Sequence, residues 1–384
     1  MIQIKNEVHA SETSGEVHTM KEILSQPGLW EEVYNLISKQ RDAITGFLKP
    51  VLEKETLRIV LAGAGTSGYI GDAAQSSLQQ AWGRPVQAVP TTEIVIQPES
   101  VFIRSVPTLL ISFARSGNSP ESVESVRLAD ACCDEVYHLI ITCNSEGALA
   151  IMGAASPDKV YCIVLPEATN DRSLAMTSSF TCMLLSAILV ANVDKLDQEF
   201  PKIQRIAEQG RLILNNKFLL ENLVLKGFGR VVFLGSGEML GIAKECQLKL
   251  LELTDGKQVC MSDSFLGFRH GPRAFVNKDT LLVYLFSRDP HIMRYERDLA
   301  EDTARDESPV ETLQIGGIDE LALPNSSKIT LNIDPENQYQ MIAATIVGQL
   351  MGYYGAVHSG INPDIPSKSG SISRVVQGVN IYQK

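Results

Sequence analysis

The chain reads Leu61-Ala62-Gly63-Ala64-Gly65-Thr66-Ser67 where an apolar, strand-like run passes through two glycines into two hydroxyl residues. Glycines permit the tight turn that joins a buried strand to a helix, and the free amide groups at the start of that helix favour an anion. A similar stretch, Phe233-Leu234-Gly235-Ser236-Gly237, occurs in the second half of the chain. Two copies of one strand, turn and helix unit indicate an internal duplication.

Short runs rich in Val, Ile and Leu surround both copies and alternate with segments long enough for helices. Because these runs lack in-and-out alternation, they are typical of strands covered on both faces, as in parallel sheets. We therefore predict an α/β fold of two tandem units, each a five-stranded parallel sheet flanked by helices, with an N-terminal helical segment. The predicted strands are 58–62, 86–90, 108–113, 138–143 and 159–165 in the first unit and 230–234, 258–261, 280–286, 311–315 and 329–333 in the second.

The length of 384 residues suits two packed domains. We expect an N-terminal tail and helical segment over 1–53, a first domain over 54–210 and a second domain over 211–384. Ligands of open parallel sheets bind beyond the carboxyl ends of the strands, so the glycine turns are expected to face the site.

The composition excludes several classes of function. The net charge of −11 argues against a nucleic-acid-binding protein, because a phosphate backbone needs a basic face. Residues 1–15 lack the apolar core of a signal peptide and the longest apolar run is too short for a membrane span, so we expect a cytoplasmic protein with no membrane contact. The seven cysteines lie mostly in apolar runs without metal-ligand spacing, which favours reduced thiols and no metal site.

A second loop with hydroxyl side chains, Ser116-Gly117-Asn118-Ser119-Pro120-Glu121, follows the third predicted strand. Ser119 is placed to cap the next helix, and two such loops can converge on one phosphate. A dinucleotide site is the alternative, but the third glycine and the acidic ribose contact of that fingerprint are missing. The two loops together favour a phosphate cradle over a plain turn.

These two loops, in their order and spacing, resemble the sugar-isomerase (SIS) domain family. In SIS enzymes they hold the phosphate of a sugar phosphate, a role that the resemblance assigns here to Gly65, Thr66, Ser67, Ser116 and Ser119. One departure is Ala114-Arg115, where aminosugar synthase relatives have Ser-Gln, so one phosphate-binding hydroxyl is missing. We expect Arg115 to supply a charged contact instead, with an Arg115 turned to solvent as the alternative.

A helix is predicted around 243–252, with Glu245, Lys249 and Glu252 at i, i+4 and i+7 on one face. A ladder of salt bridges on the surface is one interpretation of this face. The segment also resembles the glutamate-bearing helix in the isomerase domain of glucosamine-6-phosphate synthase. That resemblance implies that Glu252 is catalytic and moves a proton between carbon 2 and carbon 1 of the sugar.

The same synthases share the triplet His270-Gly271-Pro272, in which the histidine opens the pyranose ring and can reach the site of a neighbouring subunit. The turn-rich segment 362–374 resembles their C-terminal active-site tail. The synthase lysine that engages the open-chain sugar falls opposite Arg374, or near Lys368. A guanidinium forms no imine at neutral pH, so Arg374 is excluded from imine catalysis and Lys368 remains a candidate for it. Both residues are expected to bind the substrate.

Two SIS units, the tail and Gln26-Pro27-Gly28-Leu29-Trp30 together resemble the bacterial galactosamine-6-phosphate deaminase/isomerase family, formerly described as tagatose-6-phosphate ketose/aldose isomerases. The resemblance implies conversion of galactosamine 6-phosphate, or of glucosamine 6-phosphate, to the ketose 6-phosphate and ammonia, by general acid/base catalysis without metal or cofactor. It also implies a homodimer with shared active sites. The alternatives are a sugar-phosphate isomerase that releases no ammonia and a non-catalytic sugar-phosphate sensor.

Overall fold

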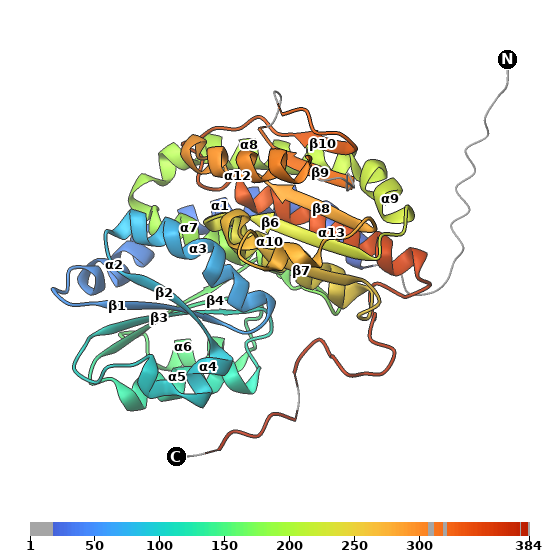
Figure 1. The fold of residues 1–384 in the computed structure, drawn as a ribbon. Helices are drawn as coiled ribbons and strands as arrows, with labels where there is room; N and C mark the ends of the chain where they lie inside the picture. Colours follow the sequence, from blue (N-terminus) through green and yellow to red (C-terminus); the bar gives the residue numbers. More distant parts are fainter. Residues whose placement is uncertain (1–17, 306–310, 318–320, 377, 383–384) are drawn as a thin grey trace.

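The computed structural model describes residues 18–305, 311–317, 321–376 and 378–382, and it shows two α/β halves stacked on one another (Figure 1). The first half holds a five-stranded sheet in the order β2-β1-β3-β4-β5, and every neighbouring pair is parallel. Its strands are β1 (Arg58–Gly63), β2 (Val86–Pro90), β3 (Thr108–Ala114), β4 (Val136–Thr142) and β5 (Val160–Val164). The predicted N-terminal tail lies outside the described residues.

The second half repeats this topology. Its sheet has the order β7-β6-β8-β9-β10, again parallel throughout, which is the order of the first sheet with five added to each strand number. The strands are β6 (Arg230–Gly235), β7 (Val259–Asp263), β8 (Thr280–Leu285), β9 (Glu311–Gly316) and β10 (Ser326–Thr330). The predicted fold class and the internal duplication are therefore confirmed.

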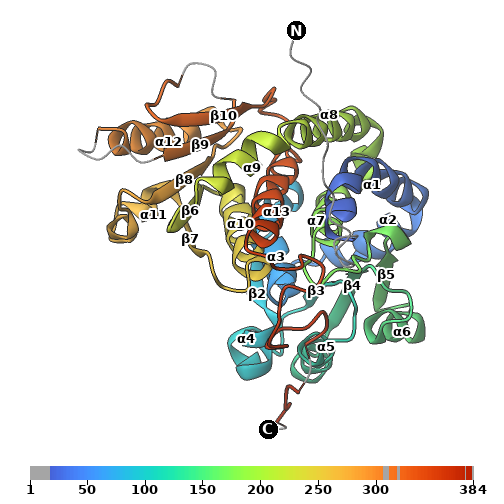
Figure 2. The same cartoon turned by 90° about the vertical axis from the view of Figure 1, so that its right-hand side faces the viewer.

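Helices cover both faces of each sheet (Figure 1). The outer face of the first sheet carries α4 (Thr91–Ile96), α5 (Pro120–Cys132) and α6 (Ala148–Ala155), and the outer face of the second carries α11 (Phe265–Phe268) and α12 (Pro290–Thr303). The remaining helices fill the layer between the two sheets and its rim: α1 (Thr19–Lys39), α2 (Arg41–Leu52), α3 (Thr66–Trp82), α7 (Ser178–Ala191), α8 (Leu196–Asn215), α9 (Lys217–Leu225), α10 (Glu238–Leu253) and α13 (Met341–His358). Figure 2 shows α10 and α13 side by side in the centre of this layer.

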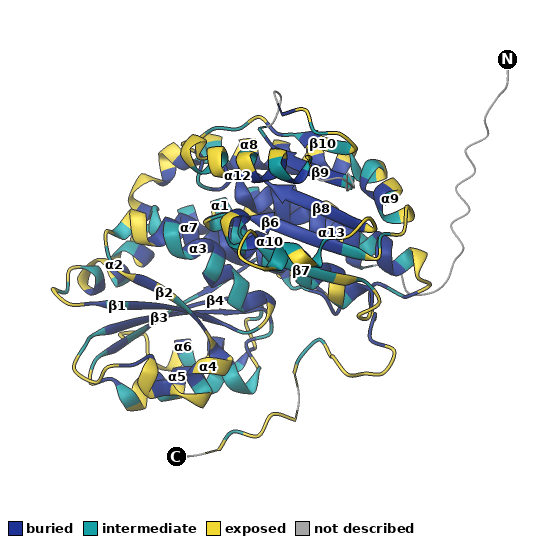
Figure 3. Cartoon of the chain, in the orientation of Figure 1, coloured by how far each residue is buried: buried dark blue, intermediate teal, exposed yellow. Residues whose placement is uncertain are grey.

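Glycines set how closely these central helices approach. A Cβ on Gly241 of α10 would lie 2.5 Å from the amide nitrogen of Ala73 on α3, and a Cβ on Gly348 of α13 would lie 2.4 Å from the Cα of Cys246. Neither position accepts a side chain without movement of a helix. The two halves therefore share one continuous apolar core, which appears as the buried interior in Figure 3.

The helix α1 joins the two halves through buried polar contacts. Gln26 donates from Nε2 to Oε1 of Gln349 at 2.6 Å, and the Trp30 indole donates to the hydroxyl of Thr181 at 3.0 Å. These pairs connect α1 with α13 and α7, which gives the Gln26-to-Trp30 motif a structural role. The division of the chain near residue 210 falls inside α8 and stays a prediction.

Among the described residues, no single helix is long and apolar enough to cross a membrane. Only Ser178–Ala191 taken with Val193–Asn215 meets that criterion, and the two segments are bent by 81° relative to each other. The first of them, α7, is buried along nearly its whole length. All seven cysteines are free, and four of them are buried.

Candidate active site

A cavity of about 270 Å³ opens at the carboxyl ends of β1 and β3, where the sequence places the ligand. The two glycine- and serine-bearing loops, helix α10 and the C-terminal segment form its walls. Eight of the ten predicted site residues line it, namely Gly65, Thr66, Ser67, Arg115, Ser116, Ser119, Glu252 and Arg374.

The first loop turns sharply from β1 into α3. Gly65 has φ of 53°, a conformation that favours glycine, and it caps the helix that begins at Thr66. A Cβ on Gly63 would lie 2.3 Å from the carbonyl oxygen of Ser67, so only glycine fits there. The hydroxyl of Thr66 is 3.5 Å from Oε1 of Glu245, and that of Ser67 is 3.8 Å from the sulfur of Met176. Both contacts are long, so an anion at this helix start can compete for both hydroxyls.

The second loop leads from β3 into α5. Ser119 caps α5, as predicted, because its Oγ accepts from the amide of Ser122 at 3.3 Å. The same Oγ donates to Oγ of Ser122 at 2.6 Å. Asn144 braces the loop by donating to the carbonyl oxygen of Ser116 at 2.9 Å. Ser122 also lines the cavity, which makes it a wall residue that the sequence motif did not single out.

Arg115 is buried against the cavity, so the interpretation that it turns to solvent is wrong. Its guanidinium donates to three carbonyl oxygens, those of Ser173 at 3.2 Å, Leu174 at 3.0 Å and Arg374 at 2.6 Å. Burial lowers the pKa of Arg115, although the charge of Asp171 offsets part of this effect. Arg115 therefore ties the loop after β5 to the C-terminal segment and places a positive charge at the cavity wall.

The C-terminal segment closes one side of the cavity, as predicted, through residues 373–376. Arg374 donates from Nε to the carbonyl oxygen of Asp171 at 2.9 Å and from Nη2 to Oδ1 of Asn170 at 2.6 Å. Further back along this segment, the carboxylate of Asp364 accepts from the amide of Thr19 at 2.8 Å and from its hydroxyl at 2.7 Å. The segment is thus attached both to the first helix and to the loop after β5.

The loop after β5 was not recognised from the sequence as part of the site. Asp171 in this loop accepts hydrogen bonds from the backbone amides of Thr177, Ser178 and Ser179, and from the hydroxyls of the same three residues. These contacts fix the start of α7 and place Leu174 and Met176 in the cavity wall. The sequence did contain a signal for this loop, which is the run of Asp, Ser and Thr residues after the fifth strand. Side chains of these types commonly form hydrogen bonds with nearby backbone groups.

Helix α10 brings three charged side chains together behind the cavity. Glu245 and Lys249 are fully buried, and Glu252 at the cavity wall is largely buried, so the interpretation as a surface ladder is wrong. Nζ of Lys249 lies 2.6 Å from Oε2 of Glu252 and 3.6 Å from Oε1 of Glu245. Lys249 and Glu245 were noticed on the helical face but were not predicted as site residues.

Burial and charge decide the protonation of this cluster. Burial raises the pKa of Glu245 to about 8, because Lys249 offsets only part of the desolvation and Glu252 adds repulsion. Burial by itself would lower the pKa of Lys249, but the attraction of Glu245 and Glu252 outweighs it and the pKa is raised. At neutral pH Glu245 therefore keeps its proton, and the ammonium of Lys249 lies against the carboxyl group of Glu252.

The two remaining predicted residues do not line the cavity of their own chain. His270 is exposed, in the loop between β7 and β8, where its Gly-Pro context predicted it. Lys368 is exposed in the C-terminal segment, and its Nζ lies 3.5 Å from the carbonyl oxygen of Gly360. Their assigned roles stay predictions. Among the described residues, no group of three or more His, Cys, Asp or Glu side chains is arranged to hold a metal.

No protein-family model matches the chain. D-galactosamine-6-phosphate deaminase AgaS of Shewanella sp. (strain ANA-3) is 40% identical over 377 residues, which cover 96% of this chain and 92% of the relative. The protein of the same name from Escherichia coli is 38% identical over 374 residues, 95% of each chain. This chain belongs to the AgaS family. The resemblance seen in the sequence is thereby confirmed.

Solved structures place the AgaS-family chain in the same fold. Tagatose-6-phosphate ketose/aldose isomerase from Escherichia coli superposes with a TM-score of 0.87 at 36% identity, covering 95% of this chain and 96% of that one. The C-terminal domain of glucosamine-fructose-6-phosphate aminotransferase from Francisella tularensis gives a TM-score of 0.76 at 18% identity, covering 89% and 96%. This second likeness shows the shared fold of two SIS units.

Proposed function

We propose that this AgaS-family protein converts an aldohexosamine 6-phosphate and water to the ketose 6-phosphate and ammonia. D-galactosamine 6-phosphate, which gives tagatose 6-phosphate, is the first candidate substrate, and D-glucosamine 6-phosphate, which gives fructose 6-phosphate, is the second. The observation that carries the proposal is the carboxyl group of Glu252, 2.6 Å from Nζ of Lys249, in the same cavity as two hydroxyl-rich helix starts. The relatives named D-galactosamine-6-phosphate deaminase support this choice of substrate.

The phosphate binds at the beginnings of α3 and α5. Amide groups at a helix start carry partial positive charge, and hydroxyls beside them donate to phosphate oxygens. Thr66, Ser67, Ser116 and Ser119 supply these hydroxyls, and Arg115 supplies a formal charge in a chain whose net charge is −11. Binding by the phosphate positions carbon 1 and carbon 2 of the sugar for the reaction.

Glu252 acts as the base on the open-chain sugar. It takes the proton from carbon 2 while the carbonyl oxygen on carbon 1 takes up a proton from water, which leaves an enol with the amino group still on carbon 2. It then returns its proton to carbon 1 while the amino group gives a proton back to water. The product of this transfer is an imine at carbon 2. Water adds to the imine carbon and the carbon–nitrogen bond breaks, which gives the ketone and ammonia. The protein needs only one carboxylate for both proton transfers at carbon, because they occur on adjacent atoms.

Lys249 and Glu245 keep Glu252 in its working state. The ammonium of Lys249, 2.6 Å from Glu252, stabilises the carboxylate and restricts its position. Glu245 fills the other side of Lys249 in protonated form, so it adds no second negative charge beside Glu252. A second ionised carboxylate there would repel Glu252 and the anionic substrate.

We also propose that His270 opens the pyranose ring from a neighbouring subunit in a homodimer. The exposed position of His270, away from its own chain's cavity, supports this arrangement. A mixture of the inactive variants H270A and E252Q tests it, because exchange forms hybrid dimers in which one site carries both intact residues. Activity should return in the mixture. If subunits exchange and no activity returns, the shared site is refuted.

The test of the reaction is to assay ammonia and ketose separately with galactosamine, glucosamine and N-acetylated hexosamine 6-phosphates. We expect equal amounts of ammonia and ketose from an amino sugar, and no ammonia from an N-acetylated one. Ketose formation from an aldose 6-phosphate without ammonia would favour simple isomerisation, the activity for which the solved Escherichia coli isomerase is named. Binding without any product would make the protein a sensor. We expect the enzyme to act in the cytoplasm.

A further inference from the structure

The internal duplication gives the second half a counterpart of the phosphate cradle. Arg58 pairs with Thr108 in the first sheet as Arg230 pairs with Thr280 in the second, which fixes the correspondence between the halves. The same correspondence places Gly237 opposite Gly65, and their φ angles are 58° and 53°. The second turn therefore keeps the backbone shape that presents a helix start to an anion.

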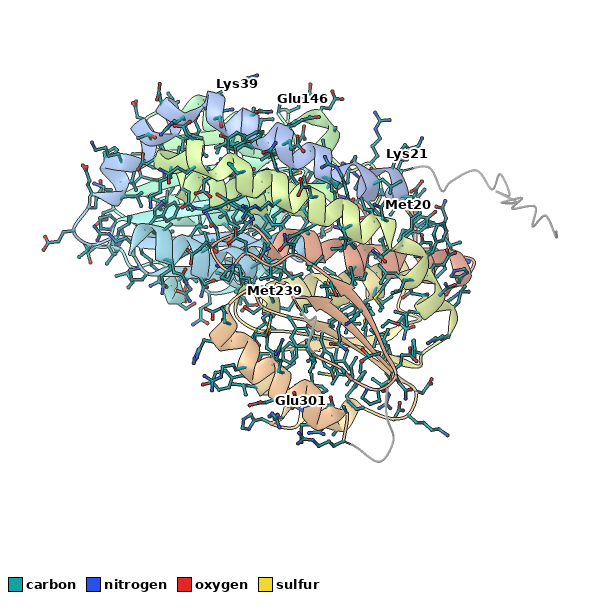
Figure 4. All side chains as sticks on the ribbon, turned by 90° about the horizontal axis from the view of Figure 1, so that it is seen from above. Met20, Lys21, Lys39, Glu146, Met239 and Glu301 are labelled. Carbon is teal, nitrogen blue, oxygen red and sulfur yellow. The ribbon has the colours of Figure 1, made fainter. Side chains whose placement is uncertain are left out.

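This second cradle is filled. The cavity beside it measures only about 10 Å³, against about 270 Å³ in the first half. Three of the residues that line it are larger than their counterparts: Glu238 replaces Thr66, Met239 replaces Ser67 and Phe286 replaces Ala114. Figure 4 labels Met239 and Glu301; Met239 is buried, whereas Glu301 on α12 is exposed.

A carboxylate from α12 reaches the counterpart of the phosphate position. Helix α12 follows β8 as α5 follows β3, and Glu296 lies on the buried side of α12. Oε2 of Glu296 accepts from the amide of Ser287 at 2.8 Å, in the loop after β8. The hydroxyl and amide of Ser236, in the second glycine turn, also donate toward this carboxyl group.

Glu296 is fully buried, and its Oε1 has no hydrogen-bond partner of normal geometry. The Ser236 donors therefore approach it at a distance or angle short of a full hydrogen bond. Burial raises the pKa of Glu296 to about 7, and the donors at Ser287 and Ser236 counteract that rise. Burial of a carboxyl group is unfavourable unless hydrogen-bond donors face it. Because the donors that face Glu296 come from the glycine turn and the loop after β8, Glu296 occupies the position of a ligand of that turn.

We propose that the carboxyl group of Glu296 is the built-in ligand of the second cradle, so that this half binds a carboxylate of its own chain and is closed to sugar phosphates. Each chain then has one sugar-phosphate site. The first half leaves Gly65 facing open space, since a Cβ there would meet nothing within 4 Å, whereas a Cβ on Gly237 would meet Ile292 of α12 at 3.8 Å. Helix α12 thus covers the glycine turn of the second half, whereas α5 leaves the glycine turn of the first half open.

Chemical rescue tests the proposal. E296A removes a group the size of acetate, so its melting temperature should fall by several degrees and recover saturably with added acetate. Acetamide, which has the same shape without the charge, should restore little. E296Q, which fills the space, should not respond to acetate. The control is E301A on the same helix, whose parent side chain is half exposed and 3.6 Å from Arg305.

An equal response of E296A, E301A and the unaltered protein to acetate would overturn the proposal. Should E296A not fold alone, the yield of refolding in acetate against chloride gives the same comparison. Calorimetry with inorganic phosphate adds a second readout, for which we expect one site per chain in the unaltered protein. Two sites would refute the closed cradle, whereas no site would instead refute the first-half cradle on which the proposed function rests.

Discussion

The close approach of α10 to α3 leads to a prediction for G241A. The new Cβ would lie 2.5 Å from the amide nitrogen of Ala73 and 2.8 Å from both its Cα and its Cβ. Non-bonded atoms prefer about 3.5–4.0 Å, so the two helices must separate by roughly 1 Å. Overpacking of this kind costs about 1–3 kcal/mol of unfolding free energy. The same shift moves Glu252 away from the helix start that holds the phosphate.

We therefore expect G241A to lose turnover more than substrate affinity, by on the order of a hundredfold in kcat, because the base is displaced while the cradle stays intact. Urea unfolding and steady-state kinetics measure the two effects. The matched control is G46A in the exposed part of α2, where a Cβ meets nothing within 4 Å. This control should gain up to about 1 kcal/mol from helix propensity and keep its activity. If G241A matches G46A in stability and rate, the approach of the helices does not position Glu252.

The other predictions concern single side chains of the cavity. E252Q should abolish turnover and leave sugar-phosphate binding nearly unchanged, since the amide keeps the shape without the base; activity near that of the unaltered enzyme would remove Glu252 from the mechanism. S67A should weaken every 6-phosphate ligand by about 1–3 kcal/mol, as measured by calorimetry, and an unchanged affinity would place the phosphate elsewhere. Burial raises the pKa of Glu245 to about 8 in the native state, so the unfolded state loses the proton of this carboxyl group at a lower pH than the native state does. The native state therefore loses stability as the pH rises from the ordinary glutamate pKa toward 8. E245Q removes that loss, so its melting temperature should rise relative to the unaltered protein over this range, and a constant difference would contradict the protonated state.

The strands were largely predictable because each follows from a local pattern. The predicted 230–234 and 280–286 differ from β6 and β8 by one residue at one end. The exception is the last strand, predicted at 329–333 and found at Ser326–Thr330. Its register against β9 brings Ser326, Ser327 and Lys328 into the ladder, while the apolar Leu331 and Ile333 lie beyond it and line the small cavity. At a sheet edge, pairing with the neighbouring strand outweighed intrinsic β-propensity.

The site was predictable where a motif maps onto a turn and much less so where partners come from distant segments. Helical spacing placed Glu245, Lys249 and Glu252 on one face, but it could not say that α3 and α13 would bury that face. The resemblance to the synthases supplied the assignment of Glu252. The hydrogen bonds of Arg115 to carbonyl oxygens after β5 and in the C-terminal segment have no local signature, because their sequence separations are 58, 59 and 259 residues.

The contact of Asp364 with the start of α1 has a consequence for biosynthesis. Thr19 is synthesised more than three hundred residues before Asp364, which accepts the hydrogen bond of its amide. A nascent chain that has reached Gly360 already holds both sheets and both glycine turns, yet it lacks the segment that Arg115 ties down. The last wall of the cavity is therefore synthesised only after translation has passed both sheets.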